Sequence, residues 1–350
     1  MYSDRVHLYR ELESAYNGKV LAYITGDRPN YSAQIAQDVI DLFIDQLDSI
    51  GPVERIVLYL YTRGGDTAAA WNIVNLIRMY CEKLTVVVPH KAHSAGTIIC
   101  LGANNIVMTK QATLSPIDPS LNTPLNPIIP GPPNSTYPVS VEAVKGYIEL
   151  AKGEYKLATD DALASALIKL SEHVHPLVLG QALRTRAQIN MLATKLLKYQ
   201  IDDEEQIKHI STFLCTDSGS HDYTINRRET ADDLKLCITK PSPEEYIIIK
   251  KIYNSFAEEM GLGQYQVPNN RLGAYSVRRS FVESISGGSD YFSSEGKKDL
   301  VALPNGQKVI QDEKHFEGWR HESGDSLPKV VEISEDGGAL RYEQDDKFGL

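Results

Sequence analysis

A serine that directly follows a predicted turn and begins a predicted helix is the residue best suited to covalent chemistry in this sequence. Ser94 lies in the segment His93–Thr97, which reads HSAGT. At such a position the hydroxyl is exposed, and the first backbone N–H groups of the helix have no partner inside it. The arrangement predicts a nucleophile for acyl transfer. The alternative is a serine that only caps the helix, which is a common role for this residue.

A glycine turn earlier in the chain supplies the second part of such a site. Gly64 and Gly65 follow a predicted strand and precede a predicted helix, in the same order as the segment around Ser94. We expect the N–H groups of Gly65 and Ala95 to converge on one carbonyl oxygen and to form an oxyanion hole. Gly-Gly turns and SAG segments are each common. Their order along the chain makes the prediction more specific.

Both turns lie in a region, from Lys19 to Asp118, where strand-like and helix-like segments alternate. This pattern is typical of α/β domains, in which helices pack on a sheet. The predicted strands cover residues 20–24, 56–61, 85–88 and 105–108, and the predicted helices cover residues 33–50, 68–81 and 94–103.

The remainder of the chain follows other patterns. Residues 119–138 are rich in Pro, Asn, Gly and Ser and are predicted to form a loop. Helical patterns follow between residues 141 and 213, including an amphipathic run over 176–197, and a last helix is predicted over 227–236. Beyond about Pro241 the pattern weakens, and the Gly/Ser cluster at 284–294 is interpreted as a linker before a charged tail.

The composition narrows the possible classes of function. The formal charge of -10 and the lack of a Lys/Arg-dense stretch argue against nucleic acid as the main partner. The four cysteines form no CxxC pair, so no zinc site is expected, and His173 and His175 lack further ligands at metal-binding spacing. The N-terminal segment has no apolar core of signal-peptide length, and the apolar region at 84–108 is interrupted by polar residues. These features predict a cytoplasmic protein without membrane contact.

Three stretches of the chain resemble the Clp protease and signal peptide peptidase superfamily, which shares the ClpP/crotonase fold. They are residues 61–66, 86–103 and 106–118. The runs KAHSAGTIICLGANNIVM, LSPIDP and SHDYTI are most similar to the serine dehydrogenase proteinase family. The resemblance extends from about Gly18 to Leu236. It implies a fold of repeated strand-strand-helix units in a peptidase domain at 1–240, with a helical insertion at about 139–215. Residues 241–350 would then be a C-terminal extension of unknown role.

The resemblance also implies which residues assist Ser94. The family is described as using Ser, Asp and His in that chain order, whereas Clp peptidases use Ser, His and Asp. Asp118 lies 24 residues after Ser94, where Clp peptidases place histidine. Asp222 matches the Clp acid, and the adjacent His221 is the first choice as the general base. Asp222 stays an alternate to Asp118 as the acid.

Two other kinds of base remain open at this stage. One is His175, which begins the long predicted helix. The other is a lysine, either Lys145 or Lys152, by analogy with signal peptide peptidase A.

The expected function is a serine endopeptidase that hydrolyses peptide or protein substrates through an acyl-enzyme, without cofactor or metal. Clp-fold proteins commonly form rings, so the resemblance implies a homo-oligomer, and the C-terminal extension is a possible contact for a protein regulator. Two other readings share the fold: a crotonase-like acyl-CoA enzyme, which needs no serine, and a non-catalytic ring-forming scaffold.

Overall fold

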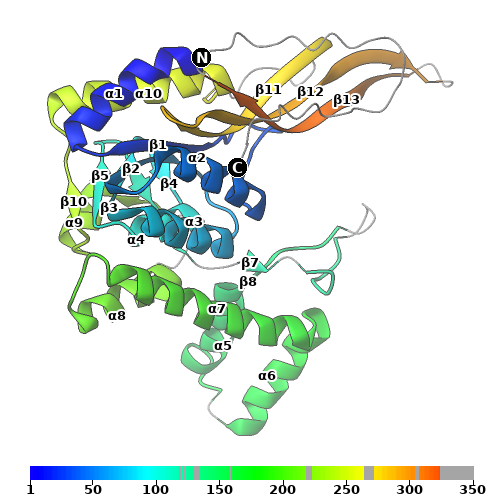
Figure 1. Ribbon diagram of the computed structural model, residues 1–350. Helices are drawn as coiled ribbons and strands as arrows, with labels where there is room; N and C mark the ends of the chain where they lie inside the picture. The colour runs from blue at the N-terminus through cyan, green and yellow to red at the C-terminus, as the bar shows by residue number, and fades with distance from the viewer. Residues whose placement is uncertain are drawn as a thin grey trace, which may run out of the picture.

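A mixed α/β fold surrounds one eight-stranded sheet (Figure 1). The computed structural model describes residues 1–117, 120–121, 123–129, 135–157, 159–217, 223–263, 272–303 and 307–323. Along the sheet the strand order is β10-β5-β3-β2-β1-β11-β12-β13. The strands are β1 (Lys19–Thr25), β2 (Val53–Tyr61), β3 (Cys81–Val88), β5 (Asn105–Met108), β10 (Ile238–Thr239), β11 (Gly273–Ser284), β12 (Gly288–Ala302) and β13 (Lys308–Glu322). The five strands from β10 to β1 run parallel, and the remaining three pair antiparallel.

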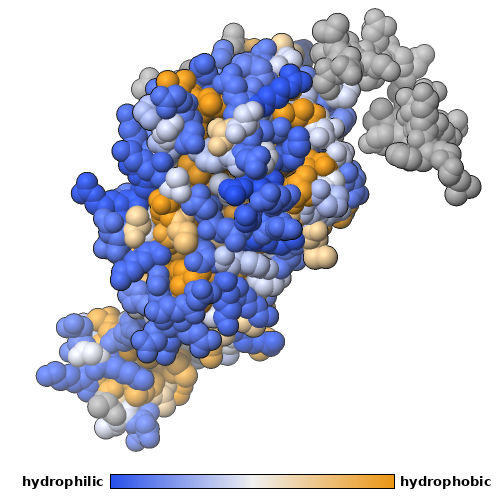
Figure 2. Space-filling view, turned by 60° about the vertical axis from the view of Figure 1, so that its left-hand side comes forward, coloured by the Kyte–Doolittle hydropathy of each residue, from blue (hydrophilic) through white to orange (hydrophobic). Residues whose placement is uncertain are grey.

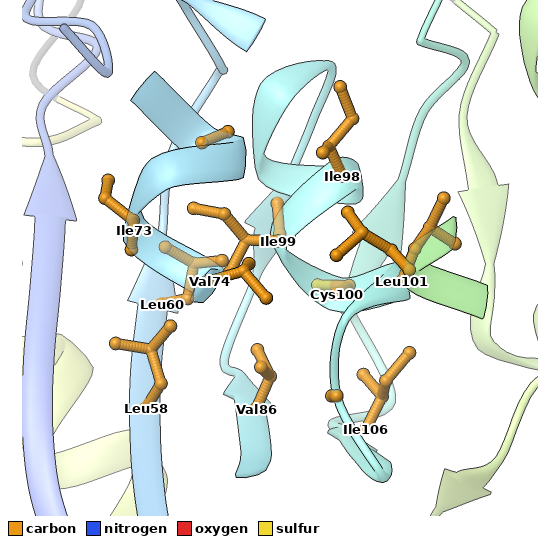
Figure 3. Close-up of a cluster of buried hydrophobic side chains, with 14 of the residues drawn as sticks. Leu58, Leu60, Ile73, Val74, Val86, Ile98, Ile99, Cys100, Leu101 and Ile106 are labelled. Atoms are coloured by element: carbon orange, nitrogen blue, oxygen red, sulfur yellow. The ribbon is translucent and has the colours of Figure 1, made fainter. Parts of the chain in front are cut away.

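The parallel strands are buried on both faces because helices cover each side, as is usual for parallel sheets. One face packs on α2 (Ile40–Ile50), α3 (Thr67–Tyr80) and α4 (Ala95–Leu101). Figure 3 shows Leu58, Val86 and Ile106 of three neighbouring strands facing side chains of α3 and α4. Alternate strand residues, such as Val57 and Val107, point to the opposite face, where α1 (Tyr2–Tyr16) and α10 (Pro243–Met260) lie side by side.

A smaller sheet and a helical region lie beyond the α4 side. The small sheet has the order β4-β6-β9 and consists of β4 (Lys91–Ala92), β6 (Thr113–Leu114) and β9 (Ile225–Asn226). A second pair joins β7 (Ser120–Leu121) to β8 (Val139–Ser140). The helices are α5 (Val141–Gly153), α6 (Asp160–His173), α7 (Pro176–Leu197), α8 (Glu204–Thr212), η2 (Phe213–Asp217) and α9 (Arg227–Asp232). The second half of α7 packs into the main core, which anchors this region to the sheet.

The C-terminal segment is part of the main sheet. β11 pairs with β1 from Leu21 opposite Ser284 to Thr25 opposite Ser280. The interpretation of residues 284–294 as a linker is therefore wrong, because these residues end β11 and begin β12, and Ser284, Ser289 and Ser293 are fully buried. Serine hydroxyls satisfy their hydrogen bonds inside this layer, as in the 2.7 Å bond from Ser289 to Glu283. The division of the chain at residue 240 stays a prediction.

A buried ion pair connects α1 to β11. The Arg5 guanidinium on α1 donates to the Glu283 carboxylate on β11 at 2.9 Å, and neither side chain is exposed. Tyr9 donates to the same carboxylate at 2.6 Å. Removal of one partner would leave an uncompensated buried charge, so α1 and β11 depend on each other.

Most predicted elements of the first 110 residues are confirmed within a few residues, and one is not. The predicted helix at 33–50 begins as a 3-10 turn, η1 (Gln37–Val39), and continues as α2. Ile35 lies within the predicted helix at 33–50, but it is extended and forms a parallel bridge with Gly65. The backbone hydrogen bonds to the glycine turn hold it in this conformation.

Candidate active site

Ser94 lies in the sharp connection between β4 and α4. Its φ of 51° and ψ of -117° belong to a region that side chains other than glycine rarely adopt. The residue is at the N-cap position of α4, yet its side chain makes no capping hydrogen bond. It is half-buried, whereas all seven residues of α4 are buried. A capping role for the hydroxyl therefore has no support, and the strained turn is typical of an exposed nucleophile.

The glycine turn after β2 lies directly against Ser94. Gly64 has φ of 106°, and a Cβ atom placed on it would lie 2.6 Å from the Cβ of Ser94 and 3.1 Å from the Ala95 nitrogen. No side chain fits at position 64 without displacement of the serine turn. The two turns are therefore in direct contact, which only glycine at position 64 permits.

The direction of the Gly65 N–H group follows from its neighbours. The Ile35 N–H donates to the Gly64 carbonyl oxygen at 2.9 Å, and the Asp66 N–H donates to the Ile35 carbonyl oxygen at 2.7 Å. In a trans peptide the C=O and N–H groups point in opposite directions, so the Gly65 N–H points away from Ile35. Among the residues described, neither Gly65 nor Ala95 donates its N–H to another group. Both groups are thus available to a ligand.

Two buried hydroxyls adjoin these turns and were not singled out from the sequence. Ser115 accepts the Ser94 N–H at 2.8 Å, and Thr62 accepts the Gly64 N–H at 2.9 Å. Ser115 lies within the LSPIDP run, and this position in a family motif was the sequence signal that could have identified it. For Thr62 the signal was its place immediately before the glycine turn.

Of the residues expected to assist Ser94, the structure describes only the alternate bases. Asp118, His221 and Asp222 lie outside the described residues. The segments that lead to them adjoin: the Ile117 N–H donates to the Leu214 carbonyl oxygen at 2.9 Å, and Leu114 of β6 pairs with Ile225 of β9.

The alternate bases have structural roles in the helical region. His175 is the N-cap of α7, and its Nδ1 accepts the Leu177 N–H at 3.2 Å. Lys145 lies on α5 with Glu149 at 3.4 Å, and Lys152 lies in the last turn of the same helix. Across the residues that the structure describes, no group of three or more His, Cys, Asp and Glu side chains is arranged to hold a metal ion.

A polar cluster beside the nucleophile loop was also missed in the sequence. Asp27 accepts hydrogen bonds from Lys91 at 2.7 Å and from Tyr61 at 3.0 Å. Burial by itself would raise the pKa of Asp27, but the hydrogen bond and charge of Lys91 outweigh it and hold the pKa below its usual value. The ion pair between Asp27 and Lys91 connects the segment after β1 to strand β4. Lys91 precedes Ser94 by three residues.

The fold and this geometry define the class as a mixed α/β protein with a serine on a strained turn that lies against a glycine turn. Residues 47–130 match the family model of the ClpP-like SDH-type serine proteinases. This range contains both turns and Asp118, and it ends before His221. The resemblance inferred from the sequence is therefore confirmed over this segment, and the match supports a serine peptidase as the general class.

Two relatives among well-curated proteins come from Methanocaldococcus jannaschii, and both are uncharacterized. The protein MJ0137 is 27% identical over 268 residues, which cover 75% of this chain and 82% of the relative. The protein MJ1495 is 28% identical over 170 residues, which cover 49% of this chain and 47% of that relative.

Solved structures with some similarity include a mutant of the 1510-N membrane-bound stomatin-specific protease and ClpP1 from Listeria monocytogenes. The first has a TM-score of 0.36 and 18% identity, covering 66% of this chain and 85% of the other. The second has a TM-score of 0.36 and 15% identity, covering 67% of this chain and 99% of the other. In the described part of the present chain, no helix has the length and apolar character needed to cross a membrane.

Proposed function

We propose that this protein is a serine endopeptidase that cleaves peptide or protein substrates through an acyl-enzyme on Ser94. The observation that carries the proposal is the turn at Ser94, whose side chain caps no helix and lies against Gly64. The backbone of Ser94 adopts a rare conformation, and its hydroxyl makes no capping hydrogen bond to the helix. A catalytic role explains this combination better than a stabilising role does. The family match over residues 47–130 supports the same class of reaction.

The backbone N–H groups of Gly65 and Ala95 are proposed to bind the oxyanion. Their support is the contact between the two turns and the direction that the Ile35 bridge imposes on the Gly65 N–H. Two donors fixed by the fold need no reorganisation when negative charge develops on the substrate oxygen.

His221 is proposed as the general base and Asp118 as the acid that orients it, with Asp222 as the alternate acid and His175 as the alternate base. The pairing of β6 with β9 supports the first choice. Leu114 lies opposite Ile225, Asp118 is four residues after Leu114, and His221 is four residues before Ile225. This pairing, with the hydrogen bond from the Ile117 N–H to the Leu214 carbonyl oxygen, brings together the segments that lead to Asp118 and His221.

The proposed reaction has two stages. In the first, the His221 imidazole removes the proton of the Ser94 hydroxyl, the oxygen attacks the substrate carbonyl carbon, and Gly65 and Ala95 bind the oxyanion. The imidazolium then gives its proton to the leaving amine as the C–N bond breaks. In the second stage the same imidazole takes a proton from water as the water oxygen attacks the acyl carbon, and it gives that proton to the Ser94 oxygen as the ester C–O bond breaks, which releases the acid and restores the serine. No metal or cofactor takes part in this scheme.

Assembly into a homo-oligomer is proposed as well. Large apolar side chains are exposed on α5, α6 and α7, and Figure 2 shows hydrophobic colouring at the lower end of the molecule, where Figure 1 places these helices. The exposed residues include Leu150, Leu167, Ile168, Leu177, Leu183 and Met191. Contiguous exposed apolar surface is typical of interfaces. A cytoplasmic location and a protein regulator that binds residues 241–350 stay predictions.

A fluorophosphonate probe tests the proposal directly, because it reacts with activated serines. The wild type should be labelled on Ser94 and should hydrolyse an activated ester and a peptide. Ser94→Ala should lose both properties, whereas Ser49→Ala, a surface serine on α2, should keep them. An unlabelled wild type that binds acyl-CoA would favour the crotonase-like reading. An unlabelled wild type that only forms rings would favour the scaffold.

A further inference from the structure

Each of the two turns of the site is fixed by a buried side-chain hydroxyl, and the two hydroxyls occupy equivalent positions. Thr62 accepts the N–H of Gly64, one residue before the donor Gly65. Ser115 accepts the N–H of Ser94, one residue before the donor Ala95. Thr62 has no exposed surface and Ser115 is 2% exposed, so no water replaces either hydroxyl.

Further bonds hold both hydroxyls in place. The Thr25 hydroxyl donates to the Thr62 oxygen at 2.7 Å, and both groups are buried. The Ser115 hydroxyl donates to the Pro116 carbonyl oxygen at 3.0 Å, and its backbone N–H donates to the Thr97 hydroxyl at 3.1 Å. These bonds fix the orientation of the Thr62 and Ser115 hydroxyls that accept from the two turns.

Thr62 also joins the two turns to each other. Its backbone N–H donates to the Lys91 carbonyl oxygen and its carbonyl oxygen accepts the His93 N–H, both at 3.1 Å. Its methyl group fills the space beside Gly96, where an added Cβ would lie 2.4 Å from it. One residue thus contacts the strand before Ser94, the helix after it and the glycine turn.

We propose that Thr62 and Ser115 are positioning residues that aim the two oxyanion donors. Each hydroxyl binds the N–H that precedes a donor, which fixes that peptide plane and leaves the following N–H directed to the substrate oxygen. The inference rests on the proposed peptidase function, because aimed donors matter only if an oxyanion forms. A loss of alignment should slow the chemical step by about 10- to 100-fold, less than loss of a donor outright, while substrate binding stays nearly constant.

The test compares Thr62→Val, Thr62→Ser and Ser115→Ala with the wild type. Thr85→Val on β3 is the matched control, because Thr85 is also buried and, among the described residues, its hydroxyl accepts one long hydrogen bond, from Arg55 at 3.5 Å. We expect Thr62→Val and Ser115→Ala to lower kcat for an activated ester and the rate of Ser94 labelling, with KM within about twofold. Thr62→Ser and Thr85→Val should retain both rates. Circular dichroism and thermal melting show which variants are folded. If Thr62→Val does not fold, the kinetics of Ser115→Ala alone test the inference.

Three results would overturn the inference. In the first, Thr62→Val and Ser115→Ala match Thr85→Val in kcat. In the second, only KM rises. In the third, Thr62→Ser, which keeps the hydroxyl, is as slow as Thr62→Val, so the hydroxyl could not be what positions the turn. A wild type without Ser94-dependent hydrolysis would instead remove the proposed function and the inference together, so the two failures are distinguishable.

Discussion

The Ile117 N–H donates a 2.9 Å hydrogen bond to the Leu214 carbonyl oxygen, and this bond joins two segments that are 97 residues apart in the sequence. Asp118 is the next residue after Ile117, and His221 follows Leu214 by seven residues. The bond links the segments that lead to the proposed acid and base.

The proposed base is tested by two histidine variants assayed together. His221→Ala should be nearly as inactive as Ser94→Ala, because members of one catalytic unit fail together. His175→Ala should keep most of its activity and lose about 1 kcal/mol of stability at most, since His175 caps α7. Ester and peptide hydrolysis are the measurements. A dead His175→Ala beside an active His221→Ala would move the base to α7, and two active variants would indicate a lysine.

Substitutions of Ser94 should separate activity from stability. Ser94→Ala should abolish hydrolysis with little change in melting temperature, because the side chain makes no capping bond. Ser94→Gly should be equally inactive but more stable than Ser94→Ala by about 1 kcal/mol, because glycine adopts φ of 51° and ψ of -117° without strain. Urea unfolding of the two variants provides the comparison. If glycine were less stable, the turn would not store strain.

Substitution of Gly65 should damage both structure and activity. A Cβ at this position would lie 2.2 Å from the Ile35 carbonyl oxygen, and φ is 148°. Gly65→Ala should therefore lower the melting temperature and reduce kcat by at least about 100-fold. Gly146→Ala on α5 is the control, since nothing lies within 4 Å of its added Cβ. That variant should be stabilised by about 0.5–1 kcal/mol with full activity.

The His321–Asp290 pair should make stability depend on pH. The 2.8 Å hydrogen bond to Asp290 raises the pKa of His321 above its ordinary value of 6.5, although burial opposes the shift. The folded state thus binds this proton more tightly than the unfolded state. The resulting stabilisation is fully present below about pH 6.5 and is lost as the pH rises through the folded-state pKa. Urea unfolding of wild type and His321→Gln should differ most at about pH 5.5 and least at about pH 8.5. A constant difference would exclude this proton linkage.

The role of the C-terminal strands is tested by truncation. A chain that ends at residue 240 loses β11 and α10, which leaves the pairing edge of β1 open and removes one of the two helices that cover one face of the sheet. We expect this chain to aggregate, whereas the full chain should remain soluble. Solubility and gel filtration are the measurements. A folded, monodisperse 1–240 chain would support the predicted division at residue 240.

The sequence by itself determined the local elements around Ser94 and the identity of the two turns. Buried strands such as β2 and β3 are short β-branched runs, and the glycines and the serine stand where strands end, so patterns over a few residues were sufficient. The tertiary structure decided everything that depends on distant pairing. Ile35 is extended because Gly64 and Asp66 bond to it, Thr62 and Ser115 matter because they meet turns from other segments, and β11 joins β1 across more than 250 residues. Serine and glycine weaken a strand signal taken alone. Hydrogen bonds to β1 and contacts with α1 stabilise β11, and β12 is stabilised by its pairing with β11 and β13, which a local pattern does not show.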